Sequence, residues 1–199
     1  MKSLLFQLPK IFLFLVSFTM PLEAAIIPFD LIGRSGVGLR TDNENHPING
    51  NGTGRGGEVG AGISFDDVSN VLTINVGWGS GQGFADLTGP VTIAHIHRAS
   101  DALFTSNGPV IFDLDGTTLG FNNSGTNGGW TNTRVTLSAV QATDLFSGLL
   151  YLNVHTALNG PGEIRGNMIA VPEPSSIALA SLAVAGLVVL RRFRRRISR

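Results

Sequence analysis

The sequence predicts an all-β domain, a sandwich or barrel of short strands with one short helix. Short apolar runs alternate with clusters of Gly, Asn, Asp and Pro, which is the pattern of such folds. Residues 25–171 contain 25 of the 26 Gly, and their length of about 147 residues suffices for one domain with a sizeable core. Because the chain has no Cys, a disulfide scaffold is excluded.

Eight strands are expected, each bounded by residues that favour turns. They are residues 26–32, 59–65, 71–78, 91–98, 110–114, 131–137, 149–156 and 163–169. One helix is expected after Ser138, which can cap it, with Val140, Leu145 and Phe146 on its apolar side and Gly148 at its end. Two Gly- and Asn-rich stretches are expected to be loosely ordered, residues 41–57 and 121–129.

The N-terminus has the features of a secretory signal peptide. Lys2 and Lys10 form a basic start, an apolar run follows to Met20, and small residues at 24–25 offer a cleavage site. We therefore expect residues 1–25 to be a signal peptide that directs residues 26–170 through the secretion translocon. An uncleaved membrane anchor is the alternative.

The C-terminus combines three elements in a fixed order. Pro172, Glu173 and Pro174 precede an apolar segment at residues 176–190. A cationic cluster follows, formed by Arg191, Arg192, Arg194, Arg195 and Arg196. The 14 residues 177–190 reach about 21 Å as a helix, so we expect a transmembrane helix shorter than the usual span of about 30 Å. The Arg-rich tail would stay cytoplasmic and leave the domain outside.

This tripartite order resembles the PEP-CTERM sorting signal of bacteria. The resemblance covers residues 171–199 and implies an exosortase-type processing enzyme that cuts near residues 172–174. It also implies transient membrane insertion, followed by delivery to the cell surface or the extracellular matrix. A plain anchor that is never cut is the alternative.

The charge of the exported segment excludes one class of partner. Residues 25–171 carry 6 Arg, no Lys and 12 acidic residues, a net charge of −6. Such a surface repels phosphate groups, so we expect no nucleic-acid partner.

Three histidines form the first candidate site. One residue separates His95 from His97, so both imidazoles lie on the same face of their predicted strand. His155 ends another predicted strand, and if the two strands are neighbours the three side chains could hold zinc or copper. Ring nitrogens more than about 6 Å apart could not share an ion, since each bond is near 2.1 Å. His46, in a Gly- and Asn-rich loop, is a weak candidate for a fourth ligand.

A structural polar network is the other interpretation of the same face. Asn153 shares the face of His155, and alternation places Glu163 and Arg165 together on the last strand. Glu163 would pair with Arg165 or with a histidine and fasten adjacent strands. We favour this network, so no cofactor is expected; zinc or copper is the alternative.

A phosphatase-like motif is interpreted as coincidental. Residues 110–117 reproduce the nucleophile strand of haloacid-dehalogenase-type phosphatases, with Asp113 as nucleophile and Asp115 as acid and base. That chemistry also needs a cation for phosphate and further acids for magnesium. After Asp115 the exported segment offers no Lys and only Asp144 and Glu163 as acids. We therefore assign no catalytic residue and expect a strand followed by an Asp-Gly turn.

Five segments in order resemble the CHRD (chordin-type) domain. They are residues 94–97, 107–114, 137–141, 149–156 and 161–166. The most specific parts are Asn-Val-His-Thr at 153–156 and Gly-Glu-Ile-Arg-Gly at 162–166, and the resemblance runs from about 57 to 169. It implies a β-sandwich and an extracellular location but no defined reaction; in animals the domain occurs in an extracellular regulator of growth factors.

Together these observations predict a Greek-key-like antiparallel β-sandwich at residues 26–170, between an N-terminal signal helix and a C-terminal hydrophobic helix. We expect a non-enzymatic interaction or structural module at the surface or in the matrix of a bacterium, with an exopolysaccharide or a surface protein as partner. The alternative is a metal-binding or redox domain that uses His95, His97 and His155. The His-x-His pattern also resembles copper/zinc superoxide dismutase, but that enzyme needs six histidines and this chain has four.

Overall fold

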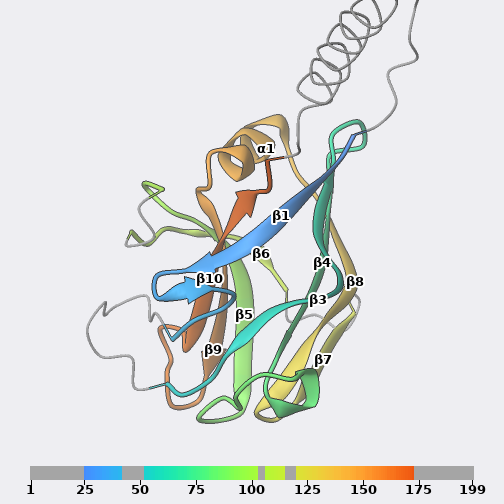
Figure 1. Cartoon of the computed structure of the whole chain (residues 1–199). Coiled ribbons are helices and arrows are strands. Elements are labelled where there is room, and N and C mark those ends of the chain that lie inside the picture. The colour runs from blue at the N-terminus through green and yellow to red at the C-terminus, as the bar shows by residue number, and fades with distance from the viewer. Residues whose placement is uncertain (1–24, 42–51, 103–105, 115–119, 173–199) are drawn as a thin grey trace, which may run out of the picture.

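The strands form one antiparallel sheet in a computed structural model that describes residues 25–41, 52–102, 106–114 and 120–172 (Figure 1). The strands are β1 (Ile26–Gly33), β2 (Gly36–Val37), β3 (Gly56–Asp66), β4 (Val71–Trp78), β5 (Val91–Arg98), β6 (Val110–Asp113), β7 (Phe121–Ser124), β8 (Asn127–Thr136), β9 (Leu150–Thr156) and β10 (Ile164–Ala170). The helices are the 3₁₀ turn η1 (Ser80–Gln82) and the α-helix α1 (Ala139–Phe146).

The sheet curls so that its two halves face each other. Its order is β6-β5-β9-β10-β1-β3-β4-β8-β7, with β2 paired to β1. The first half of β1 pairs with β3 and the second half with β10, so Phe29 lies opposite both Ile63 and Ala170. In Figure 1, β1 thus crosses between the β5–β9–β10 half and the β3–β4–β8 half. The predicted antiparallel β-sandwich with one short α-helix is confirmed.

The hydrophobic core lies between the two halves. Apolar side chains at alternate positions of β4 and β8 meet those of β5, β9 and β10. Fully buried examples are Ile74 and Trp78 on one half and Ile96, Val154 and Ile164 on the other.

Hydrogen bonds bring the two edges of the curled sheet together. The indole N–H of Trp130 donates to the Leu114 carbonyl at 2.8 Å, and the Val91 N–H donates to the Gly125 carbonyl at 3.1 Å. These bonds join the β5–β6 edge to the β7–β8 edge, and they satisfy backbone groups that an open edge would leave unpaired.

Helix α1 begins where the sequence predicts. The Ser138 hydroxyl accepts from the Gln141 N–H, and the Gln141 side chain accepts from the Ser138 N–H at 2.8 Å, which is a capping box. The predicted apolar side is partly wrong, because Val140 is 71% exposed. Leu145 is buried as predicted, and the buried face also includes Asp144, whose carboxylate binds the Arg98 guanidinium at 2.7 Å.

Two strand predictions need correction. Residues 121–129, expected to be loosely ordered, form most of the β7–β8 hairpin, in which Ser124 lies opposite Asn127. The polar composition concealed it, since apart from Phe121, which packs against Trp78 and Trp130, the segment is ordered by backbone pairing between the strands. Strand β8 accordingly begins four residues before the predicted start at Thr131. The predicted bounds of β4 and β5 are confirmed.

Strand β9 is buried on both faces, which positions the candidate site. Every residue from Leu150 to Thr156 is buried, including those on the predicted polar face. That face is covered by residues 106–108 and 157–162, two connections whose carbonyl groups receive hydrogen bonds from His155 on β9 and from His97 and Arg165 on the neighbouring strands β5 and β10. The polar side chains therefore form a second, buried layer beneath loops.

The predicted terminal helices fall almost entirely outside the described residues. The signal segment, the apolar segment 176–190 and the Arg cluster all belong to residues 1–24 or 173–199. Within the part of the chain that the structure describes, no helix is long and apolar enough to cross a membrane.

Candidate metal centre

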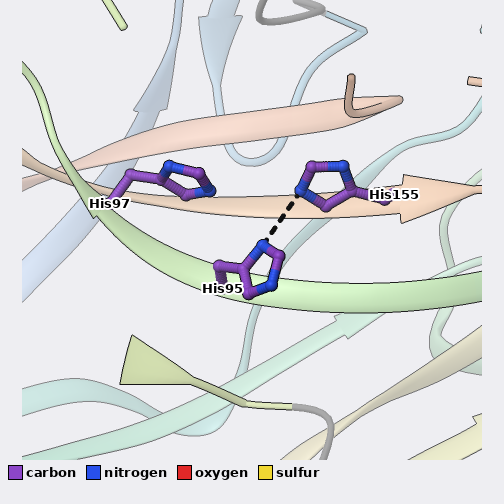
Figure 2. A group of neighbouring side chains, drawn as sticks. All are labelled: His95, His97 and His155. Atoms are coloured by element: carbon purple, nitrogen blue, oxygen red, sulfur yellow. Dashed lines mark hydrogen bonds between the residues drawn. The ribbon is translucent and has the colours of Figure 1, made fainter. Parts of the chain in front are cut away.

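Three histidines from two neighbouring strands converge in the buried polar layer. His95 and His97 lie on β5, His155 lies on β9, and the two strands are paired. Since side chains alternate along a strand, Ile96 and Val154 point into the core and the imidazoles gather on the opposite face (Figure 2). All three histidines are buried, and one ring nitrogen from each lies within 4.8 Å of the other two. This spacing meets the geometric condition for a shared ion.

Hydrogen bonds to the covering loops fix the tautomers of two rings. His97 Nδ1 lies 2.9 Å from the Gly108 carbonyl oxygen, and His155 Nδ1 lies 2.6 Å from the Gly160 carbonyl oxygen. A carbonyl oxygen only accepts, so each Nδ1 carries the hydrogen and donates it. The Nε2 atom of each neutral ring therefore presents its lone pair, which is the form that binds a metal.

In His95 the roles of the two ring nitrogens are exchanged. His95 Nε2 lies 3.3 Å from a carboxylate oxygen of Asp113, a contact in which Nε2 can donate its hydrogen. Its Nδ1 then faces His155 Nε2 at 3.1 Å, as the dashed line in Figure 2 marks. When His95 carries its hydrogen on Nε2 and His155 carries its hydrogen on Nδ1, two lone pairs point at each other across that distance. A shared proton or a metal cation between the two nitrogens removes the repulsion.

The donor set and its surroundings fit a transition-metal ion. Metal-ligating histidines almost always donate their second ring N–H to a carbonyl or a carboxylate; here His97 and His155 meet carbonyl oxygens, and His95 Nε2 lies beside the Asp113 carboxylate. Zinc–imidazole bonds near 2.1 Å place two ligand nitrogens about 3.4 Å apart in a tetrahedral site. The His95–His155 pair is already close to that spacing, and His97 needs a modest shift inward. Three protein ligands leave one position for water or another ligand.

A stack of three side chains supports His97. The Tyr151 ring lies nearly parallel to the His97 ring, with 4.9 Å between centroids and 13° between planes. The guanidinium carbon of Arg165 lies 3.7 Å from the centre of the Tyr151 ring. Arg165 also donates to the Ser106 carbonyl at 3.1 Å and to the Asn107 side-chain oxygen at 3.0 Å. It thereby holds the loop that presents the Gly108 carbonyl.

Glu163 belongs to a separate cluster. Its carboxylate is 1% exposed and accepts hydrogen bonds from several neutral groups. The donors are the N–H groups of Gly54 and Thr88, the hydroxyls of Thr88 and Thr156, and the side-chain amide of Asn159. Five such bonds, with distances from 2.6 to 3.3 Å, replace the water that a buried carboxylate loses.

The predicted network of Asn153, Glu163 and Arg165 is therefore divided. Different partners hold Glu163 and Arg165, and Asn153 donates instead to the Pro161 carbonyl at 3.2 Å. The physical reason is chain direction. Glu163 precedes β10 and turns toward the loop that contains Asn159, whereas Arg165 lies within β10 and reaches the loop at 106–108.

Several supporting groups escaped the sequence analysis. Alternation places Tyr151 on the same face of β9 as Asn153 and His155, but its stacking on His97 depends on the pairing of β5 with β9. Asp113 was considered only as part of the phosphatase-like motif; the pairing of β5 with β6 places it opposite His95. No local pattern marks Gly108 or Gly160, because their role lies in a backbone carbonyl.

The other predicted site residues lie at the end of the described chain or outside the described residues. Pro172 is exposed at the end of the described chain. The remaining candidates lie outside the described residues: His46, Asp115, Glu173, Pro174 and the Arg cluster of residues 191–196.

Comparisons with known proteins agree with the two resemblances found in the sequence. The family model of the CHRD domain matches residues 37–168, so the match begins before residue 57, and that of the PEP-CTERM protein-sorting motif matches residues 170–196. No curated protein and no solved structure matches the chain. The sorting motif implies an exported precursor that exosortase-type machinery processes. Because the first match spans well over half of the chain, this protein belongs to the CHRD domain family.

Proposed function

We propose that this protein is an exported, non-enzymatic surface module whose CHRD domain binds one transition-metal ion, zinc or copper. His95, His97 and His155 would supply the three ligands. One observation carries the proposal: the Nδ1 atoms of His97 and His155 are each held by a loop carbonyl, and His95 Nε2 lies 3.3 Å from the Asp113 carboxylate. This pattern orients three lone pairs toward a common point, which a network serving strand pairing alone does not require.

The polar-network interpretation explains the burial of these histidines less well. A hydrogen-bonded network is stable when each donor meets an acceptor. Here the assigned tautomers direct the His95 Nδ1 and His155 Nε2 lone pairs at each other across 3.1 Å. A shared proton or a metal cation between the two nitrogens relieves this contact, and we favour the cation because His97 brings a third ring nitrogen within 4.8 Å of the other two.

Metal content of the purified protein tests this function. Protein exported from cells that express the full chain should carry one zinc or copper ion per chain, measured by elemental mass spectrometry. His97→Ala and His155→Ala should lose the ion. His46→Ala is the matched control, because it removes the fourth histidine of the chain and should retain the ion. Stable, metal-free wild-type protein that takes up neither ion would contradict the proposal.

Ligand-dependent stability gives a second measurement. An ion that binds only the folded state stabilises it by about 2.7 kcal/mol at one hundred times its Kd. Zinc or copper should therefore raise the Tm of the wild-type protein and leave that of His97→Ala unchanged. A superoxide-dismutase assay on the loaded protein should show no activity above free ion, as expected for a non-enzymatic module.

The location of the mature protein is the second part of the proposal. Cleavage within residues 171–174 would release the domain from a short membrane helix whose Arg-rich tail stays cytoplasmic. The last strand, β10, ends at Ala170, directly before this segment, so cleavage there would leave the strand intact. The released domain would join the cell surface or the matrix, with an exopolysaccharide or a surface protein as partner. Mass spectrometry of extracellular protein should find no peptide from residues 191–199.

A further inference from the structure

Two Asn-Gly dipeptides supply the carbonyl groups that orient the histidine ligands. Gly108 accepts from His97 Nδ1 and is preceded by Asn107; Gly160 accepts from His155 Nδ1 and is preceded by Asn159. The two dipeptides lie in different loops, 52 positions apart in the sequence. Each asparagine side chain is held by a charged residue at the start of the last strand.

The two charged residues bind opposite ends of the asparagine amides. Arg165 donates from Nη1 to the Asn107 carbonyl oxygen at 3.0 Å. Glu163 accepts at Oε2 from the Asn159 amide nitrogen at 3.1 Å. Both charged side chains are almost completely buried, at 3% and 1% exposure, so neither contact is a loose surface pair. Charge-assisted hydrogen bonds of this kind are about twice as strong as neutral ones.

We propose that Arg165 and Glu163 are positioning residues of the metal centre, acting through Asn107-Gly108 on His97 and through Asn159-Gly160 on His155. The inference rests on the proposed metal function and deepens it. Each charged residue fixes an asparagine side chain, the next residue then presents its carbonyl, and that carbonyl sets the tautomer and the direction of a ligand. The metal affinity is therefore determined partly by two residues that never touch the ion.

The contact of Glu163 with Asn159 belongs to a set of hydrogen bonds that also explains why Glu163 is buried without a cation. Its remaining acceptor capacity binds Thr88, Thr156 and the Gly54 N–H, so that three segments of chain meet at one carboxylate. Asn159 is further held by the Thr88 and Thr156 hydroxyls at 2.8 and 3.3 Å. The Gly160 carbonyl thus belongs to a rigid loop, which is what a ligand-orienting group requires.

The contact of Arg165 with Asn107 can be tested without disturbing the core, because Asn107 is at the surface and its truncation leaves the core intact. Asn107→Ala removes the acceptor for Arg165 and should weaken zinc binding 10- to 100-fold, the usual effect of losing an outer-shell partner. Asn107→Asp keeps an acceptor and should stay within about threefold of wild type. Zn²⁺ affinity is measured by competition with a chromogenic chelator, on protein exported from cells that express the full chain.

The buried contact, in which Asn159 donates to Glu163, is tested by exchanging the donor and the acceptor. Asn159→Asp places two carboxylates against each other and should weaken zinc binding. Adding Glu163→Gln supplies an amide that can donate to the new carboxylate, so the double variant should bind Zn²⁺ more tightly than Asn159→Asp alone. A double-mutant cycle gives the coupling between the two positions. Thermal unfolding of the metal-free proteins separates affinity from stability, and Glu58→Gln, on the far half of the sheet, is the matched control for zinc affinity.

The outcomes distinguish the proposed metal function from the positioning role of Arg165 and Glu163. Wild-type protein that binds no zinc or copper would overturn the proposed function. Wild-type protein that binds Zn²⁺, together with Asn107→Ala and Asn159→Asp variants of unchanged Kd, would overturn the positioning role alone. A variant that lowers the Tm of the metal-free protein but leaves Kd unchanged would count as structural and would also overturn it.

Discussion

Tyr151 stacks on His97 with their ring planes 13° apart, and the pairing of β5 with β9 places the two residues directly opposite each other. Arg165 lies on the Tyr151 ring as well, so the ring joins a ligand to a buried cation. Tyr151→Phe preserves both ring contacts, whereas Tyr151→Leu removes them. We expect the Leu variant to be about 2 kcal/mol less stable than the Phe variant and to bind zinc more weakly. Chemical denaturation and zinc titration of the two variants provide the measurements; equal affinities would argue against a role of the stack in orienting His97.

Asp113, unlike Tyr151, should affect zinc affinity much more than stability, because its side chain is 72% exposed. It can contribute little to stability as an ion-pair partner, yet it orients His95 by receiving the Nε2 hydrogen. Asp113→Asn keeps an acceptor oxygen but removes the negative charge that raises the basicity of the ligand, so it should weaken zinc binding about tenfold and change the denaturation midpoint hardly at all. Asp30→Asn, an exposed carboxylate on β1, is the control and should leave the affinity unchanged. A large loss of stability in Asp113→Asn would contradict the assignment.

Gly162 lies in a conformation that other residues rarely adopt, with φ of 122°. A Cβ atom at this position would come within 2.2 Å of the Asn153 side-chain oxygen. Gly162→Ala should therefore destabilise the domain by backbone strain and by displacing Asn153, with a combined cost of about 2 kcal/mol or more. Gly160→Ala is the matched control, since the space around its Cβ is open and its φ is not positive. Similar midpoints for the two variants in urea unfolding would refute this reading of the loop.

The sequence was sufficient to predict most of the fold because the signals were local. Alternation of apolar residues defined β4 and β5 to the residue, and Ser138 marked the start of α1. Strand β7 was missed because Asn122 and Asn123 carry no apolar pattern and their order comes from the partner strand. Val140 was misplaced because a short helix at the rim of a sandwich buries only a narrow stripe.

The candidate site, too, was predictable only where the signals in the sequence were local. His95 and His97 could be placed on one face because a strand has a period of two. Their approach to His155 required the pairing of β5 with β9, which only the tertiary structure provides. The separation of Glu163 from Arg165 was unpredictable for the same reason: it depends on loops at residues 106–108 and 157–162 that carry no regular pattern.

Glu58 makes the stability of the domain dependent on pH. Burial raises the pKa of the Glu58 carboxyl above its usual value, although the Leu31 N–H donates to its Oε1 and partly opposes the shift. The folded protein therefore holds this proton more tightly than the unfolded chain does. By linkage, the contribution of Glu58 to stability is fully present below the ordinary Glu pKa of about 4.3 and is lost as the pH rises through the folded-state pKa.

Substitution of Glu58 by a neutral isostere should remove this pH dependence. Glu58→Gln keeps an acceptor for the Leu31 N–H, so its stability relative to wild type should increase as the pH rises above about 4.3. Asp66 provides the opposite control: hydrogen bonds from Ser69 lower its pKa, so its contribution is lost as the pH falls. Asp66→Asn should therefore differ from wild type mainly above the ordinary Asp pKa, with the difference vanishing in acid. Urea midpoints measured across the pH range test both, and parallel curves for wild type and Glu58→Gln would show that this carboxyl is not buried in the way the structure describes.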